Sequence, residues 1–399
     1  MDLMDKLAIE GGQPVRDRFL PCGQQWLNEA DIAAVTEVLK GDWLTQGPKV
    51  AEFEHKVAEY CGARYAVAVS SGSAALEAAC AAAGIGRRDE VITTPLTFAA
   101  TANAIVHNQG KPVFADIRPD TLNIDTDEIR RHLSPVTRAI IPVHFAGHPA
   151  DMDGIMALAM VRGLTVIDDA CQALGAEYKG RRIGDIADMT VLSFHPVKHI
   201  TSGEGGMVLT DSRDFYQRLR IIRHHGITRV RRGTEGSWYY QIDKPGYNFR
   251  LSDIQCALGS SQMDKLEDFL MRRRQIVSRY NQAFASVPEV ITPFEAEDVK
   301  PAWLLYIVQL NTRRLTAGRK EVYEALKAEN IGVQVHYVPL HLQPFYQASY
   351  GYKEGDFPVA ENYYQKAITL PLFPKMSDDD VEDVIKAVKK VIRYYRKDH

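Results

Sequence analysis

The chain lacks several features that would place it in a simple class of protein. Its 399 residues hold no run of about 18 apolar residues, so we expect no membrane-spanning segment. Its five cysteines are widely scattered and form no Cys-x-x-Cys pair, which argues against a disulfide framework, a zinc site or any other metal site. Neither sign of charge prevails, since 48 lysines and arginines face 51 aspartates and glutamates. The resulting net charge of −3 gives no reason to expect a nucleic-acid or membrane partner.

The start of the chain also lacks the pattern of a secretory signal. The first twelve residues contain Asp2, Asp5, Lys6 and Glu10 instead of a basic stretch followed by an apolar one. The apolar fraction of 45% and the charged fraction of 25% are ordinary for a soluble globular protein. We therefore expect a reduced, cytoplasmic protein of two or so domains.

Short apolar segments alternate with helix-length stretches from Tyr65 onward. Most of these segments are continuously apolar, which is typical of strands that helices cover on both faces. The predicted strands are residues 65–69, 90–93, 112–116, 138–144, 164–168, 189–194 and 206–209. Their order predicts an α/β domain with a mainly parallel sheet of seven strands.

The remainder of the chain predicts a helix before this sheet and a second domain after it. Residues 28–40 read as a helix with Asn28 as its N-cap and an apolar face that includes Ile32 and Leu39. From Lys265, apolar residues recur at helical spacing, and strand-like segments follow at residues 304–310 and 332–337. A final amphipathic helix begins near Ser377. We divide the chain into a large domain with its N-terminal segment, residues 1–264, and a smaller α+β domain, residues 265–399.

Chemistry in parallel sheets gathers where the strands end, and a turn suited to an anion follows the first strand. Residues 70–74 read SSGSA and lead into an alanine-rich helix. The N–H groups at a helix N-terminus bind anions, and a glycine there permits close approach. A plain serine-capped turn is an equal alternative. Neither a Walker loop nor a G-x-G-x-x-G fingerprint is present, so a phosphate monoester fits better than a pyrophosphate.

Two further strand ends carry charged residues. Asp168 and Asp169 close one strand, and because neighbouring side chains point to opposite faces, the two carboxylates must have different environments. Lys198 follows the strand at 189–194 beside a glycine-rich turn, where partial burial would favour its neutral, nucleophilic amine. A solvated loop lysine is the commoner alternative.

The order and spacing of these features point to one cofactor. Lys198 lies 29 residues beyond Asp169, and the SSGSA turn precedes both. Pyridoxal phosphate needs an anion site for its phosphate, a lysine for its Schiff base and a carboxylate that keeps its pyridine nitrogen protonated. The sequence therefore predicts a pyridoxal-phosphate enzyme.

Several longer motifs resemble those of the DegT/DnrJ/EryC/StrS sugar-nucleotide aminotransferases. The resemblance runs from about Leu20 to the last helix. It is carried by residues 43–48 (WLTQGP), 70–74 (SSGSA), 93–98 (TTPLTF), 169–173 (DACQA), 193–206 (SFHPVKHITSGEGG) and 247–253 (YNFRLSD). It implies the aspartate-aminotransferase-like fold, with a seven-stranded large domain and a smaller C-terminal domain. It also implies a homodimer with active sites at the subunit interface.

The resemblance assigns roles to the residues that match these motifs. Lys198 would carry the Schiff base, and Asp169 would pair with the pyridine nitrogen, which leaves Asp168 as structural. Gln172 would lie near the phenolic oxygen of the cofactor. Phe98 would stack on its ring, with core packing as the alternative.

The phosphate and substrate contacts follow from the same resemblance. The phosphate would be held by Ser73, by the backbone of Gly72 to Ala74 and by the Ser193 hydroxyl. Asn248 would reach it from the partner subunit. His144 and His336 are candidate substrate contacts, each with a structural role as an equal alternative.

The implied reaction is a transamination, and the acceptor sugar stays open. L-Glutamate would donate the amino group, and a nucleotide-linked keto-sugar would accept it. Residues 195–198 and 334–340 look most like the C4-aminotransferase of pseudaminic acid biosynthesis, which acts on a UDP-linked 4-keto-6-deoxy-N-acetylhexosamine. Residues 142–147 and 175–184 look equally like the enzyme that makes 4-amino-4-deoxy-arabinose, and GDP-perosamine synthases share most of these motifs.

Three other functions compete with an aminotransferase. A sugar dehydratase of the same fold carries histidine where this chain has Lys198. A non-catalytic regulatory protein could lose Lys198 or Asp169, and both are present. A nicotinamide dehydrogenase would need the missing glycine fingerprint.

Overall fold

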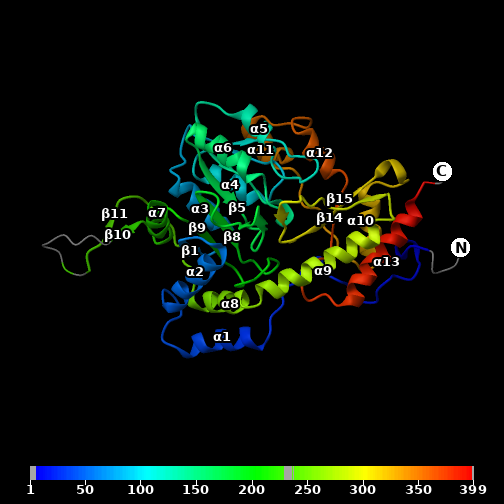
Figure 1. Ribbon diagram of the computed structural model, residues 1–399, viewed down its shortest axis with the longest axis horizontal. Coiled ribbons are helices and arrows are strands. Elements are labelled where there is room, and N and C mark those ends of the chain that lie inside the picture. The colour runs from blue at the N-terminus through cyan, green and yellow to red at the C-terminus, as the bar shows by residue number, and fades with distance from the viewer. Residues whose placement is uncertain (1–5, 229–235, 237, 398–399) are drawn as a thin grey trace.

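A seven-stranded sheet forms the centre of the larger part of the molecule (Figure 1). The computed structural model describes residues 6–228, 236 and 238–397. The strand order is β1-β9-β8-β5-β4-β2-β3, with parallel pairing from β8 to β3 and antiparallel pairing of β9 with β1 and β8. The strands are β1 (Tyr65–Val69), β2 (Glu90–Thr93), β3 (Lys111–Phe114), β4 (Thr137–Ile141), β5 (Thr165–Asp169), β8 (Met189–Ser193) and β9 (Gly206–Thr210). All seven predicted strands are confirmed, and with them the mainly parallel α/β fold.

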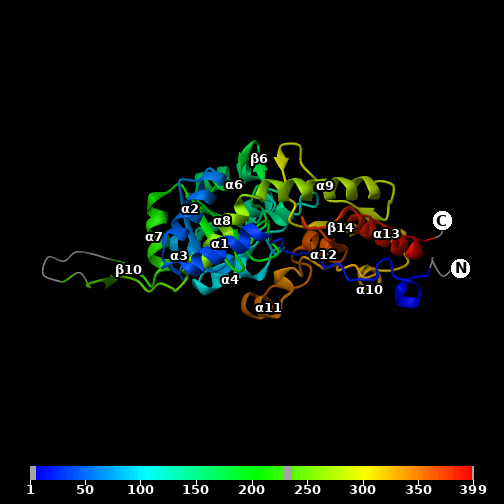
Figure 2. The ribbon, with the colours of Figure 1, turned by 90° about the horizontal axis from the view of Figure 1, so that it is seen from below.

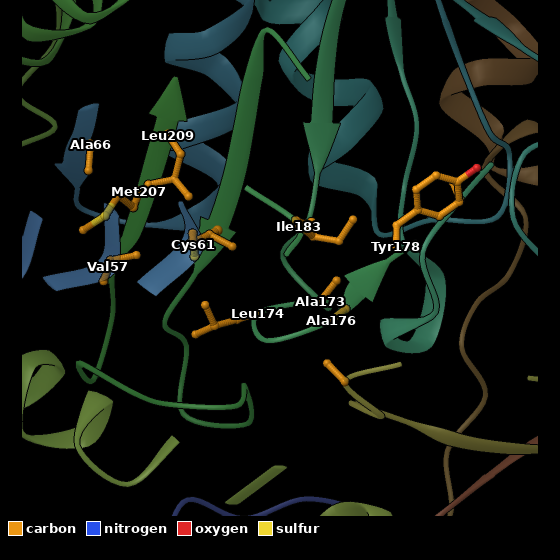
Figure 3. Close-up of a cluster of buried hydrophobic side chains, with 14 of the residues drawn as sticks. Val57, Cys61, Ala66, Ala173, Leu174, Ala176, Tyr178, Ile183, Met207 and Leu209 are labelled. Carbon is orange, nitrogen blue, oxygen red and sulfur yellow. The ribbon is translucent and has the colours of Figure 1, made fainter. Parts of the chain in front are cut away.

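Helices cover both faces of this sheet because both faces are apolar. Val67 and Val69 of β1 pack on one side with the alanine-rich helix α3, whereas Ala66 and Ala68 pack on the other side against α2. Figure 3 shows part of the cluster on the α2 side of the sheet. It includes side chains of β1, of β9 and of the loop that follows β5. The helices around the sheet are α2 (Pro48–Cys61), α3 (Gly72–Ala82), α4 (Ala99–His107), α5 (Thr126–His132), α6 (Met152–Arg162), α7 (Arg213–Arg223) and α8 (Asp253–Met263).

The first helix, α1 (Glu29–Lys40), lies at the edge of the large domain against α8 (Figure 1). Asn28 caps it as predicted, in a capping box with Asp31. The predicted apolar face is wrong in part, since Ile32 and Leu39 are exposed while Val38 and the carboxylate of Asp31 are buried. Hydrogen bonds of Asp31 to α8, and not an apolar stripe alone, decide which side of α1 faces inward.

A second core lies beyond the sheet and belongs to the C-terminal part of the chain. Its small antiparallel sheet has the order β12-β14-β15. The segment 332–337, predicted as strand-like, makes only one isolated bridge there, between Gln334 and Thr369. The elements of this part are α9 (Leu266–Phe284), β12 (Val290–Ile291), β14 (Tyr306–Leu310), α10 (Arg319–Ala328), α11 (Pro344–Tyr350), α12 (Pro358–Tyr364), β15 (Ala367–Leu370) and α13 (Asp378–Tyr395).

Helix α9 joins the two cores, and the N-terminal segment joins the second one. Leu266 and Leu270 at the start of α9 pack in the large core, whereas Tyr280 packs in the second core. Leu7 and Leu20 also lie in the second core, so both ends of the chain are on that side of the molecule (Figures 1 and 2). The domain division at residue 264 stays a prediction.

Two small sheets, one of two strands and one of three, accompany the large domain. The pair β10 (Ile227–Thr228) and β11 (Gln241–Ile242) is antiparallel and lies beyond α7, away from the central sheet (Figure 1). A three-stranded sheet combines β6 (Glu177–Tyr178) and β7 (Arg181–Arg182) with β13 (Val299–Lys300), so the C-terminal part of the chain also pairs with the large domain.

Candidate active site

Three strand ends and one helix N-terminus meet at the carboxyl edge of the sheet. Gly72, the first residue of α3, is so close to β8 that an added Cβ would lie 2.8 Å from the Cβ of Ser193. The same Cβ would lie 3.2 Å from the Sγ of Cys171, in the segment after β5. No side chain fits at Gly72, and the glycine brings the SSGSA turn against Ser193 and the residues after Asp169.

The first turn of α3 offers N–H groups to an anion at this point. Ser71 caps the helix, and its Oγ accepts a hydrogen bond from the N–H of Ala74 at 3.1 Å. The first N–H groups of a helix have no partner within it and carry the positive end of its dipole. The N–H of Ala74 is already bonded to Ser71. The N–H groups of Gly72 and Ser73 are therefore the ones that remain to bind an anion. The Ser73 side chain is exposed beside them.

Asp169 is held on one side of β5 by a chain of hydroxyl groups. Its Oδ2 accepts a hydrogen bond from Thr101 Oγ1 at 2.7 Å, and Thr101 in turn contacts Thr97 Oγ1 at 2.8 Å. Its Oδ1 accepts from the Cys171 N–H at 3.2 Å. These buried donors hold the carboxylate in a fixed orientation.

Asp168 and His144 form a separate buried pair behind this site. His144 Nε2 lies 2.7 Å from Asp168 Oδ2, which is close enough for an ion pair, but the angles are not those of a hydrogen bond. Neither side chain has exposed surface. His144 Nδ1 accepts from the Ala150 N–H at 2.9 Å, which puts the ring proton on Nε2, toward Asp168. Both ring nitrogens are therefore used inside the protein. The structure does not bring His144 to the surface of the site, and the structural alternative for this residue fits better.

The amide of Gln172 has one orientation. Its Oε1 accepts from the Ala146 N–H at 2.9 Å, so its Nε2 is the end that remains to donate, and it lies 3.4 Å from the Tyr337 hydroxyl. Ala173 and Leu174, which follow in the chain, are buried in the large core (Figure 3). The core thus anchors the segment and presents an N–H donor at the site.

Lys198 lies in a loop that buried backbone and side-chain contacts hold. Its N–H donates to His195 O at 2.9 Å, and the next residue, His199, is buried with Nε2 3.2 Å from Ala302 O. The Lys198 side chain is half-buried. Burial raises the pKa of Cys171, a trend that Asp169 reinforces and the positive charge of Lys198 opposes. Lys198 and Asp169 therefore act on the same thiol from nearby.

The segment around His336 brings the C-terminal part of the chain to this edge. Burial, and then the charge of Lys198, lowers the pKa of His336 to about 4, so this histidine is neutral at physiological pH. Its Nδ1 lies 2.8 Å from Thr369 Oγ1. The neighbouring Tyr337 is packed near Asp169, and burial first and then that carboxylate raise the pKa of its hydroxyl.

Phe98 and Asn248 have exposed surface, unlike the acidic residues of the site. The Phe98 side chain is 59% exposed, and its ring centroid lies 6.1 Å from that of Tyr337. Phe98 is therefore not a core residue, which was the alternative to a contact with the cofactor. Asn248 is exposed in a segment that Ser70 and Arg223 hold, through Ser70 N to Phe249 O at 2.8 Å and Phe249 N to Arg223 O at 3.1 Å.

Sequence reasoning missed several residues that shape the site. Thr101 lies in the first turn of α4, four residues after Thr97, which precedes the N-cap Phe98, so no regular helical spacing marked this pair in the sequence. Nothing in the sequence marked Tyr337 as a site residue except its position next to His336. The WLTQGP and YNFRLSD motifs prove to be partners, since buried Asp253 accepts from the N–H groups of Gly47 and Lys49 at 2.8 and 3.0 Å.

The donor set fits pyridoxal phosphate. A helix N-terminus with no room for a side chain at Gly72 suits a phosphate, Asp169 suits a pyridinium N–H, and Lys198 lies within electrostatic reach of Cys171 and His336. In the part of the chain that the structure describes, no three histidine, cysteine, aspartate or glutamate side chains gather to hold a metal ion. No helix there is long and apolar enough to cross a membrane.

Comparison with known proteins identifies the family. The profile of the DegT/DnrJ/EryC1/StrS aminotransferase family matches residues 25–389. The chain belongs to this family. Enzymes of the DegT/DnrJ/EryC1/StrS family use pyridoxal phosphate, and this chain is accordingly a pyridoxal-phosphate-dependent sugar aminotransferase.

Relatives of the family cover nearly the whole chain. The spore coat polysaccharide biosynthesis protein SpsC of Bacillus subtilis is 46% identical over 382 residues, which is 95% of this chain and 98% of SpsC. PseC of Helicobacter pylori, an aminotransferase of pseudoaminic acid biosynthesis, superposes with a TM-score of 0.89 at 29% identity, covering 95% of this chain and all of PseC. The pyridoxal-phosphate form of Spr1654 from Streptococcus pneumoniae gives a TM-score of 0.87 at 31% identity, over 94% and 99% of the two chains. These similarities confirm the predicted family, fold class and cofactor.

Proposed function

We propose that this aminotransferase holds its cofactor on Lys198 and transfers an amino group from L-glutamate to a nucleotide-linked keto-sugar. One observation carries the proposal: Gly72, Asp169 and the Lys198 loop meet at one edge of the sheet with Cys171 between them. This arrangement supplies an anion cradle, a fixed carboxylate and an amine to a single ligand.

Four residues at this edge of the sheet would then have distinct roles in the reaction. The bound cofactor supplies an electron sink for the bonds around the amino-bearing carbon. The Asp169 carboxylate would keep a proton on the pyridine nitrogen, and Thr101 holds that carboxylate in place. The Lys198 amine would move the proton at the reacting carbon, first as general base and then as general acid. The fixed Nε2 of Gln172 would donate a hydrogen bond to the phenolic oxygen of the cofactor.

The remaining contacts position the cofactor and the sugar. Gly72 and Ser73 N–H groups and the Ser193 hydroxyl would bind the phosphate, and exposed Phe98 would lie against the ring. Neutral His336 can donate or accept a hydrogen bond without adding charge, which suits a contact with a sugar hydroxyl. His144 is better placed to support β5 through Asp168 than to meet a substrate.

The enzyme would work as a homodimer with shared active sites. Asn248 supports this proposal because its side chain is exposed at the end of a segment that is itself anchored to β1 and α7. It would complete the phosphate site of the partner subunit. Localisation in the cytoplasm stays a prediction from the sequence.

A labelling experiment tests the role of Lys198. Borohydride reduction of the cofactor-loaded enzyme, followed by peptide mapping, should place the pyridoxyl group on Lys198. The variant Lys198→Ala should fold, since this half-buried side chain contributes little to the core, but it should lose turnover and the visible absorbance of the bound cofactor. The exposed Lys179→Ala variant serves as the matched control and should retain both. A label on any other lysine would refute the assignment.

The acceptor would be a UDP-linked 4-keto-6-deoxy-N-acetylhexosamine, aminated at C4. Support comes from residues 195–198 and 334–340, and from the similarity to PseC, which acts in pseudoaminic acid biosynthesis. The sugar carbonyl must come within about 3–3.5 Å of the amine nitrogen, and binding energy from the distant nucleotide can secure that geometry.

A panel of keto-sugars tests this choice of acceptor. The amine-loaded enzyme should return to its starting absorbance fastest with UDP-linked 4-keto sugars, and a free keto-sugar should lose turnover as well as affinity. A preference for a GDP-linked acceptor would favour the perosamine alternative, and one for UDP-4-keto-arabinose the 4-amino-4-deoxy-arabinose alternative. Amination at C3 would refute all of these.

A further inference from the structure

A buried arginine lies where the two cores meet, and within the described part of the chain its hydrogen bonds go to backbone carbonyls and not to an acidic side chain. Arg273, in the middle of α9, is 1% exposed. Its Nη1 lies 3.2, 3.1 and 2.9 Å from the carbonyl oxygens of Trp303, Leu304 and Leu372. Burial lowers the pKa of its guanidinium to about 9. A buried cation is costly unless it is hydrogen-bonded, so these carbonyls and Arg273 hold one another in place.

Two of these carbonyls belong to residues 302–304, which we call the crossing segment because it carries the chain from β13 on the large domain to β14 in the second core. The crossing segment is docked on the loop after β4. Ala302 N donates to Gly147 O at 2.9 Å, and Leu304 N donates to Ala146 O at 3.0 Å. Gly147 has a φ of +93°, and a Cβ there would lie 2.8 Å from Trp303 N, so the close approach requires glycine.

The crossing segment touches two parts of the active site from behind. Ala302 O accepts from His199 Nε2 at 3.2 Å, and His199 directly follows Lys198. Ala146, whose carbonyl accepts from Leu304, donates its own N–H to Gln172 Oε1 at 2.9 Å. One short piece of backbone therefore supports both the lysine loop and the amide that faces the cofactor.

We propose that Arg273 is a positioning residue for the transamination, acting through the crossing segment on Lys198 and Gln172. It contacts neither residue. By fixing two carbonyls of the crossing segment and one beyond β15, it sets the distance between the lysine loop, the Gln172 amide and the second core that carries His336. The inference rests on the proposed roles of Lys198 and Gln172.

The chain offers a matched control on the same helix. Arg272 also ties α9 to the second core, through Nη2 to Met376 O and to Asp378 Oδ1, both at 2.8 Å, and neither of these bonds involves the crossing segment. We expect Arg273→Met to lower kcat by about 10–100-fold with KM for the amino donor changed less than about threefold, since a misplacement of roughly 1 Å costs a rate of that order. Arg272→Met should lower thermal stability without this kinetic change.

Hydrogen exchange of the cofactor-free proteins provides the second readout. In Arg273→Met, the amides of Ala302, Leu304 and Ala146 should exchange faster than in the wild type, whereas in Arg272→Met they should not. A folded Arg273→Met protein with unchanged exchange at these amides, or with normal kcat, would overturn the proposal.

A second pair of variants keeps the test decisive if Arg273→Met does not fold. Arg273→Lys keeps a cation but loses the planar group that spans several carbonyls, so it should show a partial loss of both kcat and protection. Gly147→Ala should undo the docking from the opposite side and give the same pattern. Full activity and protection in both would contradict the proposal. Hydrogen exchange is measured without cofactor, so it does not depend on the role of Lys198. If the Lys198 assignment is wrong, the labelling experiment alone would show it, and that result can be told apart from a failure of the Arg273 proposal.

Discussion

At the scale of single residues, the two adjacent carboxylates of β5 differ in role, because one faces the candidate site and the other faces the interior. Asp169 faces Thr101 and Cys171 at the site, whereas Asp168 faces His144 in the interior. The alternation of side chains along β5 produces this split, since neighbours on a strand point to opposite sides of the sheet. The two residues should therefore respond differently to the same substitution.

We expect Asp169→Asn to lower kcat by about 10²–10³-fold, because a preorganised charge opposite the pyridine nitrogen is lost. Asp168→Asn should keep kcat within a few-fold, since Asp168 lies outside the site, and should lower the free energy of unfolding by about 1–3 kcal/mol, since the buried His144 loses the charge opposite its Nε2. Steady-state kinetics and denaturant unfolding of both variants measure these effects. The assignment would be reversed if Asp168→Asn were the slow variant and Asp169→Asn nearly normal.

At the scale of elements, α1 is attached to the large domain chiefly by a polar anchor. Asp31 is 1% exposed and accepts hydrogen bonds from Ser261 Oγ at 2.7 Å and Gln262 Nε2 at 2.9 Å, and it pairs with Lys265. Burial disfavours its charge, but these partners together hold the pKa of Asp31 below its ordinary value. Two exposed apolar residues, Ile32 and Leu39, lie on the same helix without fixing its orientation.

We expect Asp31→Ala to lower the free energy of unfolding by about 2–4 kcal/mol, because it removes the buried acceptor that Gln262 and Lys265 share and leaves them only Trp26 O and Asn28 Oδ1. The carboxylate stabilises the fold while it is charged. Its contribution should be full at neutral pH and should be lost as the pH falls through its lowered pKa. Denaturant unfolding at neutral and acidic pH measures both effects. Glu29→Ala, an exposed acid in the same helical turn, is the control and should change stability by less than about 0.5 kcal/mol. Equal stability of the two variants at neutral pH would contradict the anchor.

At the scale of the whole molecule, both chain ends and the C-terminal elements form one unit beside the sheet. Buried Glu329 accepts from the N–H groups of Ala8 and Val15 at 2.9 and 2.8 Å and pairs with Lys390 of α13 at 2.9 Å. The N-terminal segment is thereby tied to the second core, while the candidate active site lies between that core and the sheet. A partner subunit would complete the site through Asn248.

Mixing two inactive variants tests this shared site. A Lys198→Ala chain and an Asn248→Ala chain, combined by subunit exchange, should form heterodimers in which one of the two sites has both residues intact. Each homodimer should be impaired alone, and the mixture should regain up to about half of the wild-type activity per heterodimer. Persistent inactivity in heterodimers demonstrated by differential tagging would contradict sharing.

The sequence alone determined the central sheet and the chemistry at its edge. Continuous apolar runs such as residues 189–193 suit strands buried on both faces, and capping residues such as Asn28 and Ser377 mark helix starts through local hydrogen bonds. The order of the SSGSA turn, Asp169 and Lys198 indicated the cofactor because strand ends of a parallel sheet meet at one edge. These are local patterns, and local physics enforces them.

Only the tertiary structure decided which residues support that chemistry. Thr101 reaches Asp169 across 68 residues of chain, and Tyr337 reaches Gln172 across 165, so no local pattern reveals either contact. The inward side of α1 and the single bridge within residues 332–337 were likewise set by long-range hydrogen bonds. Arg273 is the extreme case, because three backbone carbonyls distant in sequence keep its charge buried. Periodicity records which residues avoid water, whereas the pairing of buried polar groups depends on which chain segments the fold brings together.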